Sequence, residues 1–153
     1  MAKVAILLGS ESDKEVMQHC VKYLKWFGID FEMKVLSAHR TPDATAQFAK
    51  TAEQSGFSLV IAAAGMAAHL PGVIAANTIL PVIGVPLASS ELRGVDALYS
   101  IVQMPPGIPV ATVAIGTAGA KNAAVLAAEI IALTDKKLRK RLEEFRKRGS
   151  KIQ

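Results

Sequence analysis

The sequence predicts a three-layer α/β/α protein built on a parallel five-stranded sheet. Short apolar runs alternate with segments of helical periodicity, which is typical of parallel strands joined by right-handed helical crossovers. Residues 31–35 instead alternate apolar and charged side chains, so the second strand is expected at a sheet edge with one solvent-facing side. This edge position favours the flavodoxin-like strand order 2-1-3-4-5. The 153 residues are expected to form one domain, residues 1–153.

The first half of the chain supplies three strands. Residues 4–8 are apolar throughout, as in a strand covered on both faces, and an apolar stripe at helical spacing follows them. The edge strand 31–35 leads into a helix expected over about 42–54, which a proline can open. Residues 59–63 predict a third, fully apolar strand, and another helix starts near Pro71.

The second half adds two strands and an extra C-terminal helix. Residues 82–85 predict the fourth strand, a short helix is expected over 95–101, and residues 110–114 predict the fifth strand. A helix over about 120–133 is apolar nearly all round. The sheet should bury one side of it, and the other side should be buried by something else, which could be another subunit. The last helix, about 135–149, is very basic but keeps an apolar stripe.

The charge distribution argues against nucleic acid as a partner. The formal net charge is +5, but residues 136–153 hold nine Lys or Arg against two Glu, while the remainder holds nine basic against eleven acidic residues. A nucleic-acid binder usually spreads cations over the folded face that meets the phosphates. We interpret the basic helix as a solvated face docked by its apolar stripe, with a subunit contact as the main alternative and an RNA or anionic-membrane contact as a minor one.

Cysteine usage and the N-terminus predict a cytoplasmic protein. Cys20 is the only cysteine, so no intramolecular disulfide can form and a reducing compartment is expected. Cys20 lies on the apolar stripe of the first helix, which favours a core role. The N-terminal apolar run is too short for a signal peptide or a membrane span, so no membrane association is expected.

Polar side chains follow each of the first three strands. Strands 2, 1 and 3 are neighbours in the predicted order, so the turns after them are expected to meet at one rim of the sheet, where ligands bind in such folds. These turns supply the candidate site residues, which are Ser10, Ser12 and Asp13; Ser37, His39 and Arg40; and Gly65, Ala68, His69 and Leu70.

The first turn allows two interpretations. Ser12 followed by Glu15 fits a helix capping box, and Ser10 followed by Asp13 resembles one. A cap does not need two serines and an acid together, so we also consider a ligand site. Hydroxyls and free helix N–H groups would hold a phosphate, and the carboxylate would accept hydrogen bonds from sugar hydroxyls.

The second and third turns carry the groups suited to proton transfer and anion binding. His39 can give and take a proton near neutral pH, and its neighbour Arg40 is a permanent planar cation suited to phosphate. Gly65 leaves little bulk, so a flat ligand could approach the backbone there. His69 precedes the helix start at Pro71, whose N–H groups favour an anion such as a carboxylate, although a structural role for His69 is equally open.

Several other chemistries lack the residues they need. Two histidines without a second cysteine or a suitably spaced acid make a poor zinc site. Neither a G-x-G-x-x-G after the first strand nor a Walker lysine is present. A phosphoacceptor receiver domain would need an aspartate after the third strand, where residues 62–65 are Ala and Gly. We therefore expect no zinc site, no dinucleotide or Walker-type nucleotide site and no phosphoacceptor aspartate.

Four motifs stand in order along the chain: GSESD at 9–13, SAHRTP at 37–42, AAHLPG at 67–72 and SIVQMP at 100–105. Together they resemble the 5-(carboxyamino)imidazole ribonucleotide mutase family of de novo purine biosynthesis, and the resemblance covers nearly the whole chain. Any one motif is a weak signal, but four in order within one domain are a strong one. Met66 departs from the glycine that many relatives have at this position.

The resemblance implies a carboxylate shift without ATP, metal or organic cofactor. The carboxyl group would leave the exocyclic amine of an aminoimidazole ribonucleotide as carbon dioxide and be captured by a ring carbon in a small, dry pocket. His39 would protonate the departing amine and later remove the ring proton. Ser10, Ser12, Asp13 and Arg40 would hold the ribose phosphate, and His69 and the small residues before it would border the ring. Relatives are typically octamers with sites at subunit contacts, so a homo-octamer is expected.

Two alternatives remain open at this stage. A related branch carboxylates aminoimidazole ribonucleotide directly with carbon dioxide, and it lacks the His-Leu-Pro-Gly form found at residues 69–72, which favours the mutase. The other alternative is a noncatalytic flavin or nucleotide carrier on the same fold. The low aromatic content near the three turns argues against flavin stacking.

Overall fold

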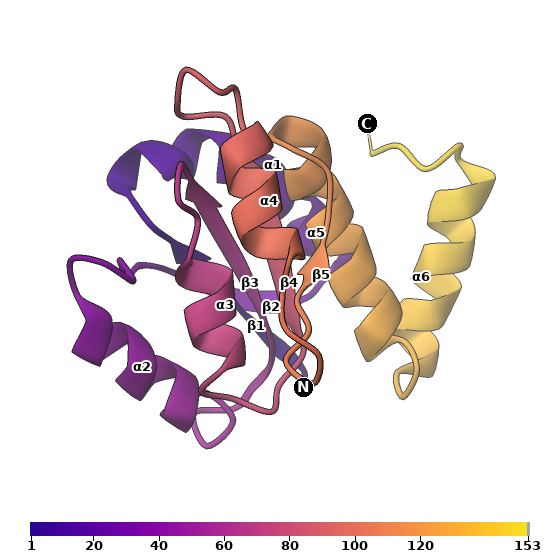
Figure 1. The fold of residues 1–153 in the computed structure, drawn as a ribbon. Coiled ribbons are helices and arrows are strands. Elements are labelled where there is room, and N and C mark those ends of the chain that lie inside the picture. Colours follow the sequence, from indigo (N-terminus) through magenta and orange to yellow (C-terminus); the bar gives the residue numbers. More distant parts are fainter. Residues whose placement is uncertain (153) are drawn as a thin grey trace.

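Five parallel strands run through the middle of the molecule in the order β2-β1-β3-β4-β5, as predicted (Figure 1). The structure is a computed structural model and describes residues 1–152. The strands are β1 (Lys3–Leu8), β2 (Asp30–Val35), β3 (Phe57–Gly65), β4 (Val82–Leu87) and β5 (Ala111–Thr112). The helices are the 3-10 helix η1 (Glu11–Asp13), α1 (Lys14–Phe27), α2 (Pro42–Thr51), α3 (Leu70–Ala75), α4 (Val95–Val102), α5 (Thr117–Ile131) and α6 (Lys136–Lys147).

Helices cover both faces of the sheet, which confirms the three-layer prediction. Alternate residues of β1 enter different apolar clusters: Ile6 and Leu8 pack with α1, α5 and α6, whereas Leu7 packs with α2, α3 and α4 (Figure 1). Successive side chains of a strand point to opposite faces, so a strand buried on both faces must be apolar at every position. The uninterrupted apolar run at the N-terminus has this cause.

The helix α5 is covered within its own chain. Its alanine-rich surface packs against the sheet and against α1 and α6, so its apolar composition needs no second subunit to explain it. Small side chains such as Ala123 and Ala127, both fully buried, allow this close packing. The C-terminal helix is docked as predicted, because Leu138 and Phe145 are buried while its charged residues stay outside.

The first helix buries the cysteine and ends where predicted. Cys20 is fully buried in the cluster beneath α1, and this burial raises the pKa of its thiol to about 12. The core role expected for it is confirmed. The helix stops at Gly28, whose φ of 73° is the left-handed conformation that favours glycine at a helix C-terminus.

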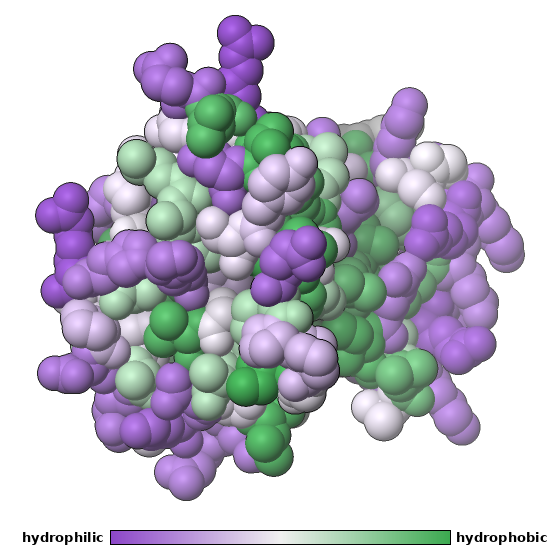
Figure 2. All heavy atoms as spheres, viewed as in Figure 1, coloured by the Kyte–Doolittle hydropathy of each residue, from purple (hydrophilic) through white to green (hydrophobic). Residues whose placement is uncertain are grey.

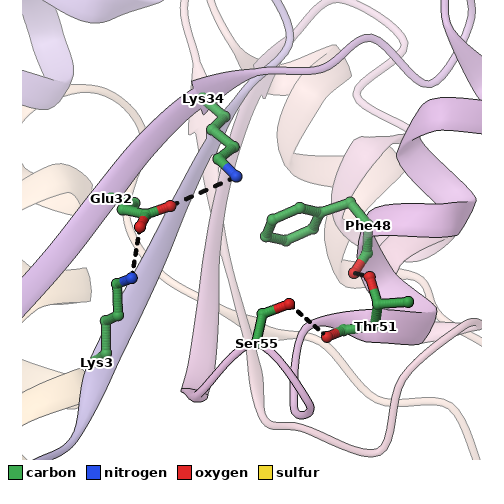
Figure 3. Close-up of polar contacts among 6 residues, drawn as sticks. All are labelled: Lys3, Glu32, Lys34, Phe48, Thr51 and Ser55. Carbon is green, nitrogen blue, oxygen red and sulfur yellow. Dashed lines mark hydrogen bonds and ion pairs between the residues drawn. The ribbon is translucent and has the colours of Figure 1, made fainter.

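The edge strand β2 is confirmed and anchors α2 beside it. Figure 3 shows Glu32 between Lys3 and Lys34, which both pair with its carboxylate. The Lys34 ammonium also lies 5.2 Å from the centroid of the Phe48 ring on α2. This contact and the buried Ala49 hold α2 against the sheet, and α2 begins directly after the turn that carries His39.

Several predicted boundaries differ from the structure, among them those of α5, which spans Thr117–Ile131 rather than 120–133. The end of α2 and the length of β5 have identifiable causes. The helix α2 ends at Thr51 rather than Gln54, because the backbone then tightens: the Ser55 N–H also reaches the Ala52 carbonyl, and the Gly56 N–H donates to the Glu53 carbonyl. The Ser55 hydroxyl donates to the Thr51 carbonyl at this end of the helix (Figure 3).

The fifth strand is two residues long instead of five. In a parallel sheet the N–H and C=O of one residue point to the same neighbouring strand. The Pro86 carbonyl accepts from the Gly116 N–H on the β5 side, but proline has no N–H to donate in that direction. The regular hydrogen-bond ladder between β4 and β5 is therefore interrupted.

Candidate active site

The turns after β1, β2 and β3 meet at one rim, as the strand order requires. Leu8 pairs with Val35 on one side and with Ala63 on the other, so the three strands end almost level. A cavity of about 600 Å³ opens at this rim, between these turns and the segment after β4. A parallel sheet places the ends of its strands, and therefore the residues that follow them, on one side of the molecule.

The first turn is a capping box between Ser10 and Asp13. The Ser10 N–H donates to Asp13 Oδ2 at 3.1 Å, and the Ser12 N–H donates to Ser10 Oγ at 3.4 Å. The two serine hydroxyls are 3.0 Å apart and face the cavity. The alternative box between Ser12 and Glu15 does not form, because α1 starts after Asp13 without a side-chain cap.

Asp13 is the only carboxylate on the cavity wall among the described residues, and its side chain is buried. Burial raises the pKa of this carboxyl above its ordinary value of 3.8, and the hydrogen bond from the Ser10 N–H opposes part of that effect. A buried carboxylate at a ligand cavity has unused acceptor capacity, because Ser10 occupies one of its two oxygens.

The second turn is held by hydroxyl groups whose hydrogen bonds do not involve the His39 side chain. The Ser37 N–H donates to Thr41 Oγ1 at 3.0 Å, and the Arg40 N–H donates to Ser37 Oγ at 3.0 Å. Thr45, fully buried on α2, donates its hydroxyl to the carbonyls of Ser37 and Thr41. The turn is therefore tied to the first turn of α2 by side chains that the sequence places at fixed spacings.

The third turn brings His69 against His39. His39 Nε2 and His69 Nδ1 are 2.7 Å apart, and the two rings meet edge to face with their centroids separated by 4.7 Å. A nitrogen–nitrogen contact this short needs one hydrogen and one lone pair, so at most one of the two facing nitrogens carries a proton. The pair can thus hold a proton and pass it on without charging both rings.

Gly65 lets the segment after β4 reach the cavity. A Cβ atom at Gly65 would lie 1.7 Å from Ser89 Oγ and 3.2 Å from the Leu87 carbonyl oxygen. Only glycine permits this approach. Ser89 consequently lines the cavity beside the third turn.

Nine of the ten predicted site residues line this cavity, and the remaining one, Ala68, is buried in the apolar cluster beneath the third turn. The nine are Ser10, Ser12, Asp13, Ser37, His39, Arg40, Gly65, His69 and Leu70.

Ser89, Thr41 and Met66 also line the cavity, although none of them was among the predicted site residues. The signal for Ser89 was available, because a polar pair follows the fourth strand and that strand neighbours the third in the predicted order. Met66 stands out in the sequence only as a departure from the glycine of many relatives, with no role in the cavity assigned to it.

In a single chain the cavity is open to solvent. His39, Arg40 and His69 are exposed, whereas Asp13 and Leu70 are buried at its base. The small, dry pocket expected for carbon dioxide is therefore not complete within one chain. Residues 1–152 contain no group of three His, Cys, Asp or Glu that could hold a metal ion, and no helix among them is long and apolar enough to cross a membrane.

Comparison with known protein families identifies the chain. A family model described as AIR carboxylase matches residues 3–151. The chain belongs to the AIR carboxylase family. The family resemblance carried by the four motifs is thereby confirmed.

Relatives within the AIR carboxylase family are close in sequence. The N5-carboxyaminoimidazole ribonucleotide mutases of Escherichia coli K12 and Pyrococcus abyssi are each 56% identical to this chain over 146 residues. The matches cover 95% of this chain and 86% and 83% of the two relatives. The crystal structure of Treponema denticola PurE superimposes with a TM-score of 0.88 at 32% identity, covering 98% of this chain and 92% of that one.

Proposed function

We propose that this member of the AIR carboxylase family is an N5-carboxyaminoimidazole ribonucleotide mutase, an isomerase of de novo purine biosynthesis. The His39–His69 contact of 2.7 Å carries the proposal, because it sets a proton donor and a proton acceptor side by side on the wall of the cavity. The high identity to relatives named as mutases supports the same reaction.

The reaction can be written with all atoms accounted for. The bond between the carboxyl carbon and the exocyclic amine breaks, carbon dioxide forms, and His39 gives the amine a proton. The neighbouring ring carbon then forms a bond to the carbon dioxide, and its proton returns to His39. The product, 4-carboxy-5-aminoimidazole ribonucleotide, is an isomer of the substrate, so no cofactor, metal or net proton is needed. His69 supports the transfer through the hydrogen bond between its Nδ1 and His39 Nε2, in which either nitrogen can be the donor.

The first and second turns are assigned to the ribose phosphate. The hydroxyls of Ser10 and Ser12 and the guanidinium of Arg40 supply donors for phosphate oxygens, and the buried Asp13 carboxylate accepts from ribose hydroxyls. Ser37 mainly fixes the turn through its hydrogen bond with the Arg40 N–H.

The third turn is assigned to the imidazole ring and the carbon dioxide. Gly65 and Leu70 line the base, and Ala68 shapes the turn from below without reaching the cavity. Small and apolar walls with few nucleophiles suit a transient carbon dioxide, which must stay beside the ring carbon until the new bond forms.

A homo-octamer in the cytoplasm, with sites at subunit contacts, is part of this proposal. The helix α4 leaves Val95, Tyr99 and Val102 exposed at helical spacing, and Leu92 in the turn before the helix is exposed as well. Figure 2 shows apolar residues on this side of the molecule, in contrast to the hydrophilic surface of α6. An exposed apolar face of this kind suits a second copy of the chain. No nucleic-acid or membrane partner is proposed.

Direct carboxylation of aminoimidazole ribonucleotide is the second candidate, because the family model carries that description. An absorbance assay distinguishes the two. The wild-type chain is supplied either with the carboxyamino substrate and no ATP, or with aminoimidazole ribonucleotide and bicarbonate. Turnover of the first supports the mutase, and turnover of the second pair alone assigns the chain to the carboxylase branch. Turnover of neither would leave a noncatalytic nucleotide carrier and overturn the enzyme proposal.

A further inference from the structure

Met66 combines a strained backbone with an exposed apolar side chain at the edge of the candidate site. Its φ is 55°, in the left-handed region, and the residue is 59% exposed. It follows the last residue of β3 directly and lines the cavity that holds the two histidines.

Neither property of Met66 favours folding. The left-handed conformation is unfavourable for residues with a Cβ atom, and methionine lacks the short polar side chain with which Asn or Asp can offset that cost. The exposed thioether gains little from burial in the chain itself. Backbone strain that persists at a ligand cavity is a reason to look for a functional contact.

The third turn holds Met66 in a defined position. The Ala68 N–H donates to the Met66 carbonyl at 2.9 Å, and the His69 N–H donates to the Ala67 carbonyl at 2.8 Å. Two successive tight turns thus connect Met66 to His69. Ser89 fills the space beside Gly65, so Met66 is the first residue after β3 with a sizeable side chain at the cavity.

The cavity also lacks a usual partner for a flat ring. Of the described residues that line it, none is Phe, Tyr or Trp, and the two histidine rings contact each other. Leu70 is buried at the base. Met66 is therefore the largest apolar side chain that is free to move onto a ligand, and a thioether makes favourable contacts with aromatic rings.

We propose that the Met66 side chain lies on the aminoimidazole ring of the bound ribonucleotide and acts as a positioning residue. This inference rests on the proposed function. The thioether keeps the ring in place beside His39 and covers part of an otherwise open cavity. The flexible, unbranched side chain suits this task, because it can move aside for entry and release.

Binding of two probes to the full-length chain tests the role of Met66. The probes are 4-carboxy-5-aminoimidazole ribonucleotide and ribose 5-phosphate, measured by calorimetry, because only the first carries the ring. We expect Met66→Ala and Met66→Gly to weaken binding of the ribonucleotide by about 3- to 10-fold and to leave ribose 5-phosphate within about 2-fold. Met66→Leu should retain most of the affinity, since it keeps the apolar volume.

The two small variants separate side-chain contact from backbone strain. Met66→Ala keeps the left-handed strain and Met66→Gly removes it, so equal effects on the ribonucleotide support contact with the ring. Ile79→Ala is the matched control, because Ile79 is 90% exposed and precedes β4 at the opposite end of the strand; it should bind both probes as the wild type does.

Several outcomes would overturn the role of Met66. These are unchanged ribonucleotide binding in the Ala and Gly variants, equal weakening of both probes, a Gly variant that binds as wild type while Ala does not, or a change in subunit number by light scattering. The last would place Met66 in a contact between copies. Failure of the wild-type chain to bind the ribonucleotide would overturn the proposed function as well.

Discussion

Replacing His39 by Asn should remove proton transfer while leaving the site assembled. The turn that carries His39 is held by hydrogen bonds of Ser37, Thr41 and Thr45, and none of them uses the imidazole. The Asn amide nitrogen falls near the position of the imidazole Nδ1. It cannot reach the Nε2 position from which His39 contacts His69.

The size of the effect differs between binding and turnover. The lost contact with His69 is one hydrogen bond between exposed side chains, worth about 0.5–1.5 kcal/mol, so ligand affinity should fall by no more than about tenfold. Positioned acid–base groups contribute about 10²–10⁴-fold to a proton transfer. His39 acts in two successive steps of one cycle, so the slower step limits the rate, and turnover should fall by about 10²–10⁴-fold rather than by the product of two such factors.

His39→Gln provides the matched control. Its longer amide reaches the Nε2 position and can keep the contact with His69, but it cannot carry a proton between substrate atoms. We expect Gln to bind the product ribonucleotide as the wild type does and to be as inactive as Asn in the absorbance assay. If either variant kept more than about a tenth of wild-type turnover, His39 would not be the proton carrier. An affinity loss above about a hundredfold would make it a binding residue instead.

Three further predictions concern stability. Gly65→Ala should lower the free energy of unfolding by about 1–3 kcal/mol in denaturant unfolding and should reduce turnover, because the new Cβ would lie 1.7 Å from Ser89 Oγ. Adding Ser89→Gly should restore part of the stability and part of the turnover. A double variant that recovers neither would contradict this contact. Burial raises the pKa of Asp13, so its proton stabilises the fold below the ordinary value of 3.8 and this contribution is lost as pH rises through the raised pKa. Asp13→Asn should therefore have a higher free energy of unfolding than the wild type at neutral pH, and the difference should become smaller as the pH falls toward 3.8. A difference that does not depend on pH would refute the burial argument. The same variant should bind the ribonucleotide more weakly. Phe145→Ala should cost about 3–5 kcal/mol, because this 1% exposed ring packs in the aromatic cluster under α6, yet ligand affinity in the folded protein should not change.

The strand order could be predicted because a few residues carry a strong physical signal. The alternation at residues 31–35 arises only for a strand with one wet face, and β2 lies at the edge for that reason. The length of β5 could not be predicted in the same way. It depends on which neighbour the backbone of Pro86 faces, and that direction is set by the register between β4 and its partners.

The candidate site was predictable at the level of turns but not of contacts. The order of the strands is enough to bring His39 and His69 to one rim. Their separation of 2.7 Å depends on the register across three strands and on two side-chain rotamers, for residues that lie 30 positions apart. Met66 stood out in the sequence as a departure from glycine, but its exposed position could not be predicted, because methionine has no preference for the left-handed backbone that it adopts.

The openness of the cavity connects the chemistry to assembly. In the proposed reaction, carbon dioxide freed beside His39 could diffuse out of an exposed site before the neighbouring ring carbon captures it, so the reaction needs a cover that one chain does not supply. The segment after β4 carries Ser89 at the cavity and then the exposed Leu92 and Val95, so the apolar face of α4 begins close to the site in the chain. A second copy docked on that face is a candidate for the cover that the cavity needs. Met66 and a neighbouring subunit would then enclose the ring from different sides, and catalysis would depend on both.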